Sequence, residues 1–172
     1  DGTGCIMLSG ETAAGKYPVE AVKIMARIAE RTENDMNYQR GFFERSIQEH
    51  THSVTDAISH ATCMTAYNLN AAAILTVTKY GGTARMISRF RSDIPIIGCT
   101  PDAVTLRQLN MSWGVTPLSV GEEHVTDVLI EHAVDAARHA GLVKTGDTVV
   151  ITAGVPLGRS GTTNLIRVYT VE

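Results

Sequence analysis

From residue 53 onward, the apolar positions of the chain switch repeatedly between two patterns. Short continuous apolar runs are typical of buried strands, and apolar residues spaced three and four apart are typical of helices. The apolar runs predict strands over 72–77, 94–99, 114–120, 148–153 and 165–171. The helical spacing predicts helices over 53–69, 83–90, 101–110 and 125–140.

Strands that alternate with helices favour an α/β fold of three layers, in which a mostly parallel sheet has helices on both faces. The loop before the run at 165–171 is too short for a helical crossover. We therefore expect this last strand to pair antiparallel at an edge of the sheet.

The first 52 residues follow a different pattern. An apolar run at 5–8 predicts a strand, and Pro18 with the spacing after it predicts a helix that ends near Asp35. A lone buried strand lacks neighbours, so we expect the chain to be a piece of a longer protein. The segment 37–52 is polar and poorly periodic, and we interpret it as a linker between residues 1–36 and a domain at 53–172.

Composition narrows the classes of function. Of the 172 residues, 44% are hydrophobic and 19% are charged, which suffices for a buried core. The net charge of −3 gives no electrostatic reason to expect nucleic acid or an anionic membrane as a partner. No apolar run approaches the roughly 20 residues that span a bilayer. Three cysteines without paired spacing indicate a reduced compartment, and we expect the cytoplasm.

The clearest candidate site is the glycine-rich turn between the predicted strand 72–77 and the predicted helix 83–90. Two adjacent glycines let the backbone fold closely around a ligand, and the first N–H groups of the helix point into the turn. A lysine and two threonine hydroxyls lie beside them, and this set suits a phosphate group. The candidate phosphate-binding residues are Thr78, Lys79, Tyr80, Gly81, Gly82 and Thr83.

A second glycine-rich loop, residues 154–164, leaves the predicted strand 148–153. If the two strands are neighbours, this loop could close over a phosphate that the first loop holds. Arg159 would then offer its fork of donors to the phosphate oxygens, beside Ser160 and Gly161. Both loops also fit ordinary turns whose glycines supply positive φ, and the spacing alone leaves these interpretations open.

A third glycine-rich stretch, Gly10–Lys16, matches most of a nucleotide-triphosphate loop. The next residue is Tyr17, where that motif needs a hydroxyl for magnesium, and Pro18 places the helix start beyond the lysine. These two departures argue against this interpretation. The histidines are scattered without a cysteine or carboxylate cluster, and no serine–histidine–carboxylate trio can be assembled, so the sequence predicts neither a metal site nor catalytic residues.

Several motifs resemble the pyruvate kinase family in the order in which that family has them. Residues 1–22, which include IMLSGETAAGKYPVEAV at 6–22, are similar to the end of the catalytic barrel. The later motifs resemble the C-terminal domain, and they are TDAI at 55–58, TKYGGT at 78–83, GLVKTGD at 141–147 and SGTTN at 160–164. The resemblance covers the whole chain and implies that residues 1–36 are the last strand and helix of the barrel.

The resemblance also implies a function. The parent enzyme would transfer a phosphoryl group from phosphoenolpyruvate to ADP in glycolysis with magnesium and potassium, and the residues that hold metal and substrate would lie upstream of Asp1. This chain alone would therefore be inactive and need no cofactor. The family's C-terminal domain binds a phosphorylated effector and forms a subunit interface of a homotetramer. The turn 78–83 matches its phosphate loop, and Arg159, Ser160 and Gly161 match the loop over the effector.

The chain departs from the family pattern in two places. Gly4 replaces an acidic or amide residue of the barrel motif, which affects one hydrogen bond on the barrel side. Members activated by fructose bisphosphate place a tryptophan and an arginine around the second phosphate, and a count back from Gly141 puts Glu122 and Leu129 there. A carboxylate would repel a second phosphate, so we expect a monophosphate effector, such as AMP or a sugar monophosphate.

Two other classes of function stay open at this point. The chain could be a structural assembly domain without an effector site, or a free-standing enzyme that acts on a phosphorylated substrate. The last predicted strand, 165–171, could mediate self-association, as the family's last strand does, or could simply be solvated.

Overall fold

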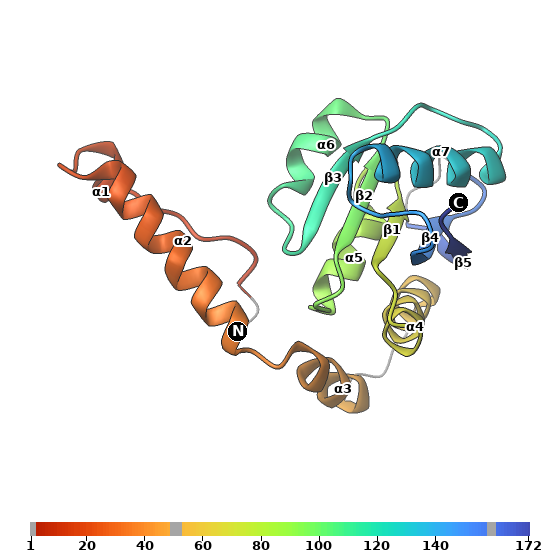
Figure 1. Cartoon of the computed structure of the whole chain (residues 1–172), viewed down its shortest axis with the longest axis horizontal. Helices are drawn as coiled ribbons and strands as arrows, with labels where there is room; N and C mark the ends of the chain where they lie inside the picture. Colours follow the sequence, from red (N-terminus) through yellow and green to blue (C-terminus); the bar gives the residue numbers. More distant parts are fainter. Residues whose placement is uncertain (1–2, 49–52, 158–160) are drawn as a thin grey trace.

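The computed structural model describes residues 3–48, 53–157 and 161–172. Within these residues, five strands form one sheet in the order β3-β2-β1-β4-β5 (Figure 1). The strands are β1 (Ala73–Val77), β2 (Ile96–Thr100), β3 (Val115–Ser119), β4 (Thr148–Gly154) and β5 (Thr163–Thr170). The helices are α1 (Gly10–Ala13), α2 (Pro18–Asp35), α3 (Tyr38–Gln48), α4 (Val54–Asn68), α5 (Gly82–Arg89), α6 (Ala103–Leu109) and α7 (Thr126–His139).

The pairing of the strands confirms the predicted fold class. β1 pairs in parallel with β2 and with β4, β2 pairs in parallel with β3, and β5 pairs antiparallel with β4 at the edge. The central strand β1 is buried along its whole length, which explains why its sequence is a continuous apolar run rather than an alternating one.

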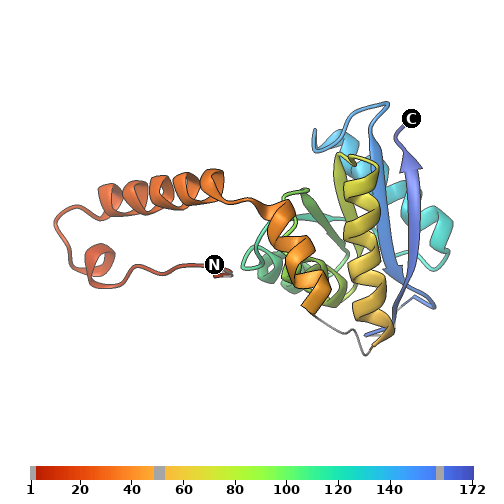
Figure 2. The same ribbon diagram turned by 90° about the horizontal axis from the view of Figure 1, so that it is seen from below.

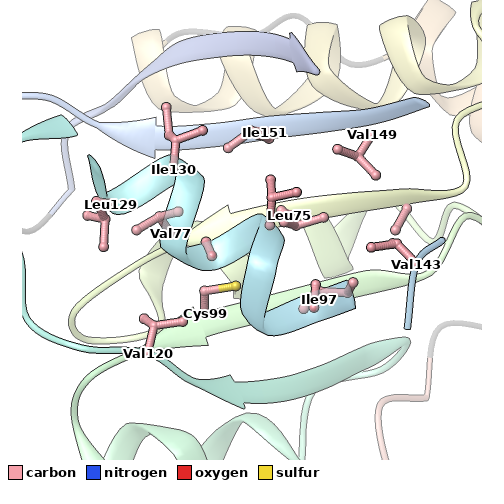
Figure 3. Close-up of a cluster of buried hydrophobic side chains, with 14 of the residues drawn as sticks. Leu75, Val77, Ile97, Cys99, Val120, Leu129, Ile130, Val143, Val149 and Ile151 are labelled. Atoms are coloured by element: carbon pink, nitrogen blue, oxygen red, sulfur yellow. The ribbon is translucent and has the colours of Figure 1, made fainter. Parts of the chain in front are cut away.

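The side chains of β1 alternate between two apolar cores, one on each face of the sheet. Leu75 and Val77 point to the face that α7 covers, where they meet Leu129 and Ile130 (Figure 3). Ile74 points to the other face. There it joins buried residues of α3, α4 and α5 and of the neighbouring strands, among them Phe42, Cys63, Ala66, Ile87, Ile96 and Val150. The helices therefore cover both faces, which gives three layers.

For the first 52 residues, one expected strand is absent and the predicted linker contains a helix. Residues 5–8 are not a strand, because within the described residues no other strand pairs with them, and Ile6 and Met7 are exposed. Residues 38–48 of the predicted linker form helix α3, and its Phe42 is 1% exposed. A few aromatic side chains dock this short polar helix, with Tyr38 against Trp113 and Phe43 against Tyr67 beside Phe42, and periodicity does not detect them.

The predicted helix starts agree with the structure within two residues. The Ser53 side chain accepts a hydrogen bond from the Asp56 N–H and caps α4. Helix α6 begins at Ala103 rather than at Pro101, because Asp102 accepts the Thr105 N–H and takes the cap position. Gly141, with φ of +71°, follows the C-cap Ala140 of α7 in the left-handed conformation that commonly ends a helix.

Helices α1 and α2 project away from the sheet domain, as Figures 1 and 2 show. Trp113, before β3, connects the two parts. Its indole Nε1 donates to Glu33 Oε1 at 3.0 Å, and its ring lies 5.2 Å from the Tyr38 ring and 5.0 Å from the Arg91 guanidinium carbon. No helix among the described residues is both long enough and apolar enough to cross a membrane.

Candidate anion-binding site

The two predicted loops lie at the same rim of the sheet. Because β1 and β4 are parallel neighbours, the loops that follow them leave the sheet side by side. The hydroxyl oxygens of Thr83, after β1, and Thr163, at the start of β5, are 2.8 Å apart. The Thr55 hydroxyl of α4 donates to the Gly161 carbonyl at 3.1 Å and ties the second loop to the domain.

A pocket of about 260 Å³ opens between these loops. Three segments form most of its wall: the end of β1 with the turn 78–83, the segment 121–124 that leads to α7, and the loop between β4 and β5. The lining residues are Val77, Thr78, Lys79, Tyr80, Gly82, Thr83, Pro101, Gly121, Glu122, Glu123, His124, Leu129, Gly154, Leu157, Gly161, Thr162 and Thr163.

Most of the predicted site residues line this pocket. Five of the six residues of the turn do so, and Gly161 joins them from the second loop. The sixth residue of the turn, Gly81, does not line the pocket but caps α5. Arg159 and Ser160 lie outside the described residues.

The turn brings the N-terminus of α5 to the pocket. Gly81 has φ of +78°, a left-handed conformation that favours glycine, and the helix begins at Gly82 rather than at Thr83. The first intrahelical bond runs from the Arg85 N–H to the Gly81 carbonyl. The N–H groups before Arg85 therefore lack helical acceptors, and the residues that carry two of them, Gly82 and Thr83, line the pocket.

The charged side chains at the pocket are paired with one another or with neighbouring residues. Lys79 Nζ lies 2.7 Å from Glu122 Oε1, and both side chains line the pocket. This contact lowers the pKa of the Glu122 carboxyl and raises the pKa of the Lys79 ammonium, in each case through the hydrogen bond first and the opposite charge second. Glu123 is held by a different partner, His132 Nδ1 at 3.1 Å.

The base of the second loop is held by one side chain. Asn164 accepts the Val155 N–H through Oδ1 at 2.8 Å and donates to the Val155 carbonyl through Nδ2 at 2.6 Å. These two bonds close the loop where it leaves β4 and enters β5. The loop that carries Gly161 is thereby closed at its base, next to the two strands that it connects.

Two residues that the family count singled out line the pocket, and other lining residues were missed. Glu122 and Leu129, identified by their distance from Gly141, both line the pocket. Thr163 was missed as a site residue, although it lies in the same SGTTN motif as Gly161. Glu123 carries no sequence signal that could have identified it. Among the described residues, no group of three or more histidine, cysteine, aspartate or glutamate side chains could hold a metal ion.

Comparison with known proteins relates this domain to one family. The family pattern described as "Pyruvate kinase, alpha/beta domain" matches residues 56–169. A pyruvate kinase of Clostridium acetobutylicum is 48% identical over 172 residues, which are all of this chain and 36% of that protein. A pyruvate kinase of Geobacillus stearothermophilus is 47% identical over 172 residues, which are 29% of its length.

A crystal structure of a pyruvate kinase from Cryptosporidium parvum superposes with a TM-score of 0.85 at 30% identity. The match covers 98% of this chain and 33% of the crystallised one. The chain thus spans about a third of the length of the relatives that it matches. It belongs to the pyruvate kinase family, and its sheet domain is the C-terminal alpha/beta domain of that family.

Proposed function

We propose that this chain is the regulatory and assembly domain of a pyruvate kinase and that its pocket binds a phosphorylated effector. The parent enzyme transfers a phosphoryl group from phosphoenolpyruvate to ADP in glycolysis in the cytoplasm, as a homotetramer that uses magnesium and potassium. The observation that carries the proposal is the pocket, in which a helix N-terminus, a lysine and threonine side chains face one space.

Each of these groups suits a phosphate. The free N–H groups at the start of α5 donate to anionic oxygens, and the helix dipole favours negative charge at this end. Thr78 and Thr83 add hydroxyl donors, and Lys79 supplies the positive charge. Gly82 is exposed, so the backbone is open to close approach by the ligand.

The effector that fits this pocket carries one phosphate. Glu122 and Leu129 line it. By the count back from Gly141, they stand where members activated by fructose bisphosphate have a tryptophan and an arginine around the second phosphate. A carboxylate repels such a group, and an alkyl chain offers it nothing. AMP and sugar monophosphates meet this requirement, whereas fructose 1,6-bisphosphate does not.

The bound phosphate would couple to the rest of the protein through the elements that it touches. A ligand that bridges the turn 78–83 and the loop 154–164 fixes the ends of β1, β4 and β5 together. β5 is the edge strand, so ordering at this rim biases the packing of subunits against that edge. Couplings of this kind are typically about 1–3 kcal/mol.

Isothermal titration calorimetry of the whole chain tests the proposal. We expect AMP or a sugar monophosphate to bind more tightly than fructose 1,6-bisphosphate. Thr83→Ala and Lys79→Glu should each weaken the binding at least tenfold, and Lys144→Glu, an exposed lysine outside the pocket, should leave it unchanged. Unchanged affinity in both pocket variants would contradict the choice of loop, and tighter binding of the bisphosphate would contradict the monophosphate assignment.

A turnover assay addresses the remaining alternative. A free-standing enzyme would form pyruvate from phosphoenolpyruvate and ADP, or hydrolyse ATP, with this chain alone. The proposed regulatory domain binds phosphate compounds without turnover. A domain that serves assembly alone neither binds phosphate compounds nor turns them over.

A further inference from the structure

Lys79 is the sole lysine or arginine among the described residues that line the pocket, and it already has an anionic partner. Its ammonium contacts the Glu122 carboxylate at 2.7 Å. The backbone on which Lys79 sits is held in place, since its carbonyl accepts the Thr100 hydroxyl at 3.2 Å. The positive charge of Lys79 is therefore already balanced by a carboxylate from another segment of the pocket wall.

The carboxylate reaches Lys79 from a segment that is separate from the phosphate turn. Residues 121–124 join β3 to α7, and Gly121 and Glu122 are exposed. Glu123, the next acidic residue, is paired with His132 on α7, so the two neighbouring carboxylates have different partners. Glu122 is the one that the fold directs to the phosphate-binding lysine.

We propose that Glu122 is a built-in competitor for Lys79, so that an anion enters the pocket by exchange with this carboxylate. The inference rests on the proposed function and adds a role to Glu122. Repulsion alone would make Glu122 discriminate against a second phosphate. Exchange makes Glu122 lower the affinity for every anion, inorganic phosphate included, because each anion must break the same ion pair.

Exchange also moves a structural element. When a phosphate pairs with the Lys79 ammonium, the Glu122 carboxylate loses its contact with that lysine. This contact joins segment 121–124 to the turn 78–83. That segment leads directly into α7, whose Asp127 contacts Arg167 of the edge strand β5 at 2.6 Å. The occupancy of the pocket is thereby linked to the edge strand β5 through a change of partner by Lys79.

The ion pair is partly exposed, with side chains 41% and 58% accessible for Lys79 and Glu122, so its effect is moderate and sensitive to salt. The test is calorimetric titration of the full chain with inorganic phosphate at low ionic strength. We expect Glu122→Gln to bind about two- to fivefold more tightly than the unchanged chain. Glu131→Gln, which removes an exposed carboxylate of α7 outside the pocket, should change the affinity less than twofold.

The double variant Lys79→Gln/Glu122→Gln separates exchange from general repulsion. If Glu122 acts through Lys79, adding Glu122→Gln to Lys79→Gln should change the affinity less than twofold. A full gain in that background would contradict the exchange, and so would an equal affinity of Glu122→Gln and the unchanged chain. If none of the proteins binds phosphate, the proposed function fails together with the exchange.

Discussion

Gly82 offers a substitution whose effects on stability and on binding have opposite signs. It is the first residue of α5 and lines the pocket. Its backbone lies outside the left-handed region that Gly81 occupies. A Cβ built on Gly82 meets no atom within 4 Å, so Gly82→Ala adds a methyl group without a clash.

The magnitude follows from these observations. Replacing glycine by alanine where the backbone conformation already suits alanine stabilises a protein by about 0.4–1 kcal/mol, chiefly by restricting the unfolded chain. In a chain of this length, 1 kcal/mol corresponds to about 2–4 °C in Tm. We therefore expect Tm to rise by about 1–4 °C. The same methyl group occupies space at the N-terminus of α5, so phosphate affinity should fall at least tenfold.

Gly81→Ala is the matched control, one residue earlier in the same turn. Alanine at φ of +78° costs about 1–2 kcal/mol, and its Cβ would lie 3.0–3.1 Å from the Arg85 guanidinium. This variant should lower Tm by about 2–8 °C. Both variants change one hydrogen to a methyl group, so the comparison reports the difference in backbone conformation together with the contact to Arg85.

Two measurements decide the outcome. Circular dichroism at 222 nm during heating gives Tm, and calorimetric titration with phosphate gives the affinity. A lower Tm for Gly82→Ala would refute the inference that the Gly82 backbone conformation suits alanine. A higher Tm with unchanged phosphate affinity would refute the role of the α5 N-terminus in binding.

Two further predictions concern the rest of the domain. Burial raises the pKa of the Cys63 and Cys99 thiols to about 12, so at pH 8 almost none of either is thiolate, and a thiol reagent should label only the exposed Cys5 quickly until the chain is unfolded. Rapid labelling of more than one thiol would contradict this burial. Ser53→Ala removes the cap from the Asp56 N–H and should lower the free energy of unfolding in urea by about 1 kcal/mol, whereas an unchanged value would mean that the cap is replaced by water.

The fold was predictable because the central strands are buried, and continuous apolar runs mark buried strands in a sequence. β1 and β4 are buried on both faces and read as continuous apolar runs between helices. The segments before residue 53 were harder to predict. The docking of α3 depends on a few aromatic side chains, chiefly the buried Phe42, and no periodic pattern surrounds them. The run at 5–8 looks like a strand, but a strand needs a partner that local sequence cannot supply.

The site was predictable as two loops and not as one pocket. Each loop has a glycine signature, but their closeness depends on the order of the strands, which places β4 beside β1. The contact between Thr83 and Thr163 follows from that order. Counting from Gly141 located Glu122 by family likeness, and its ion pair with Lys79 depends on how the segment before α7 crosses the rim.

Trp113 lies where the projecting helix α2 meets the sheet domain, and it is the single tryptophan of the chain. Ser88 of α5 donates to its carbonyl at 2.6 Å, so the helix that begins at the pocket ends against this residue. Departure of α2 would break the bond from the indole to Glu33, expose the ring further and shift its emission to longer wavelength. The molecule therefore carries an intrinsic optical reporter of how its two units are held together.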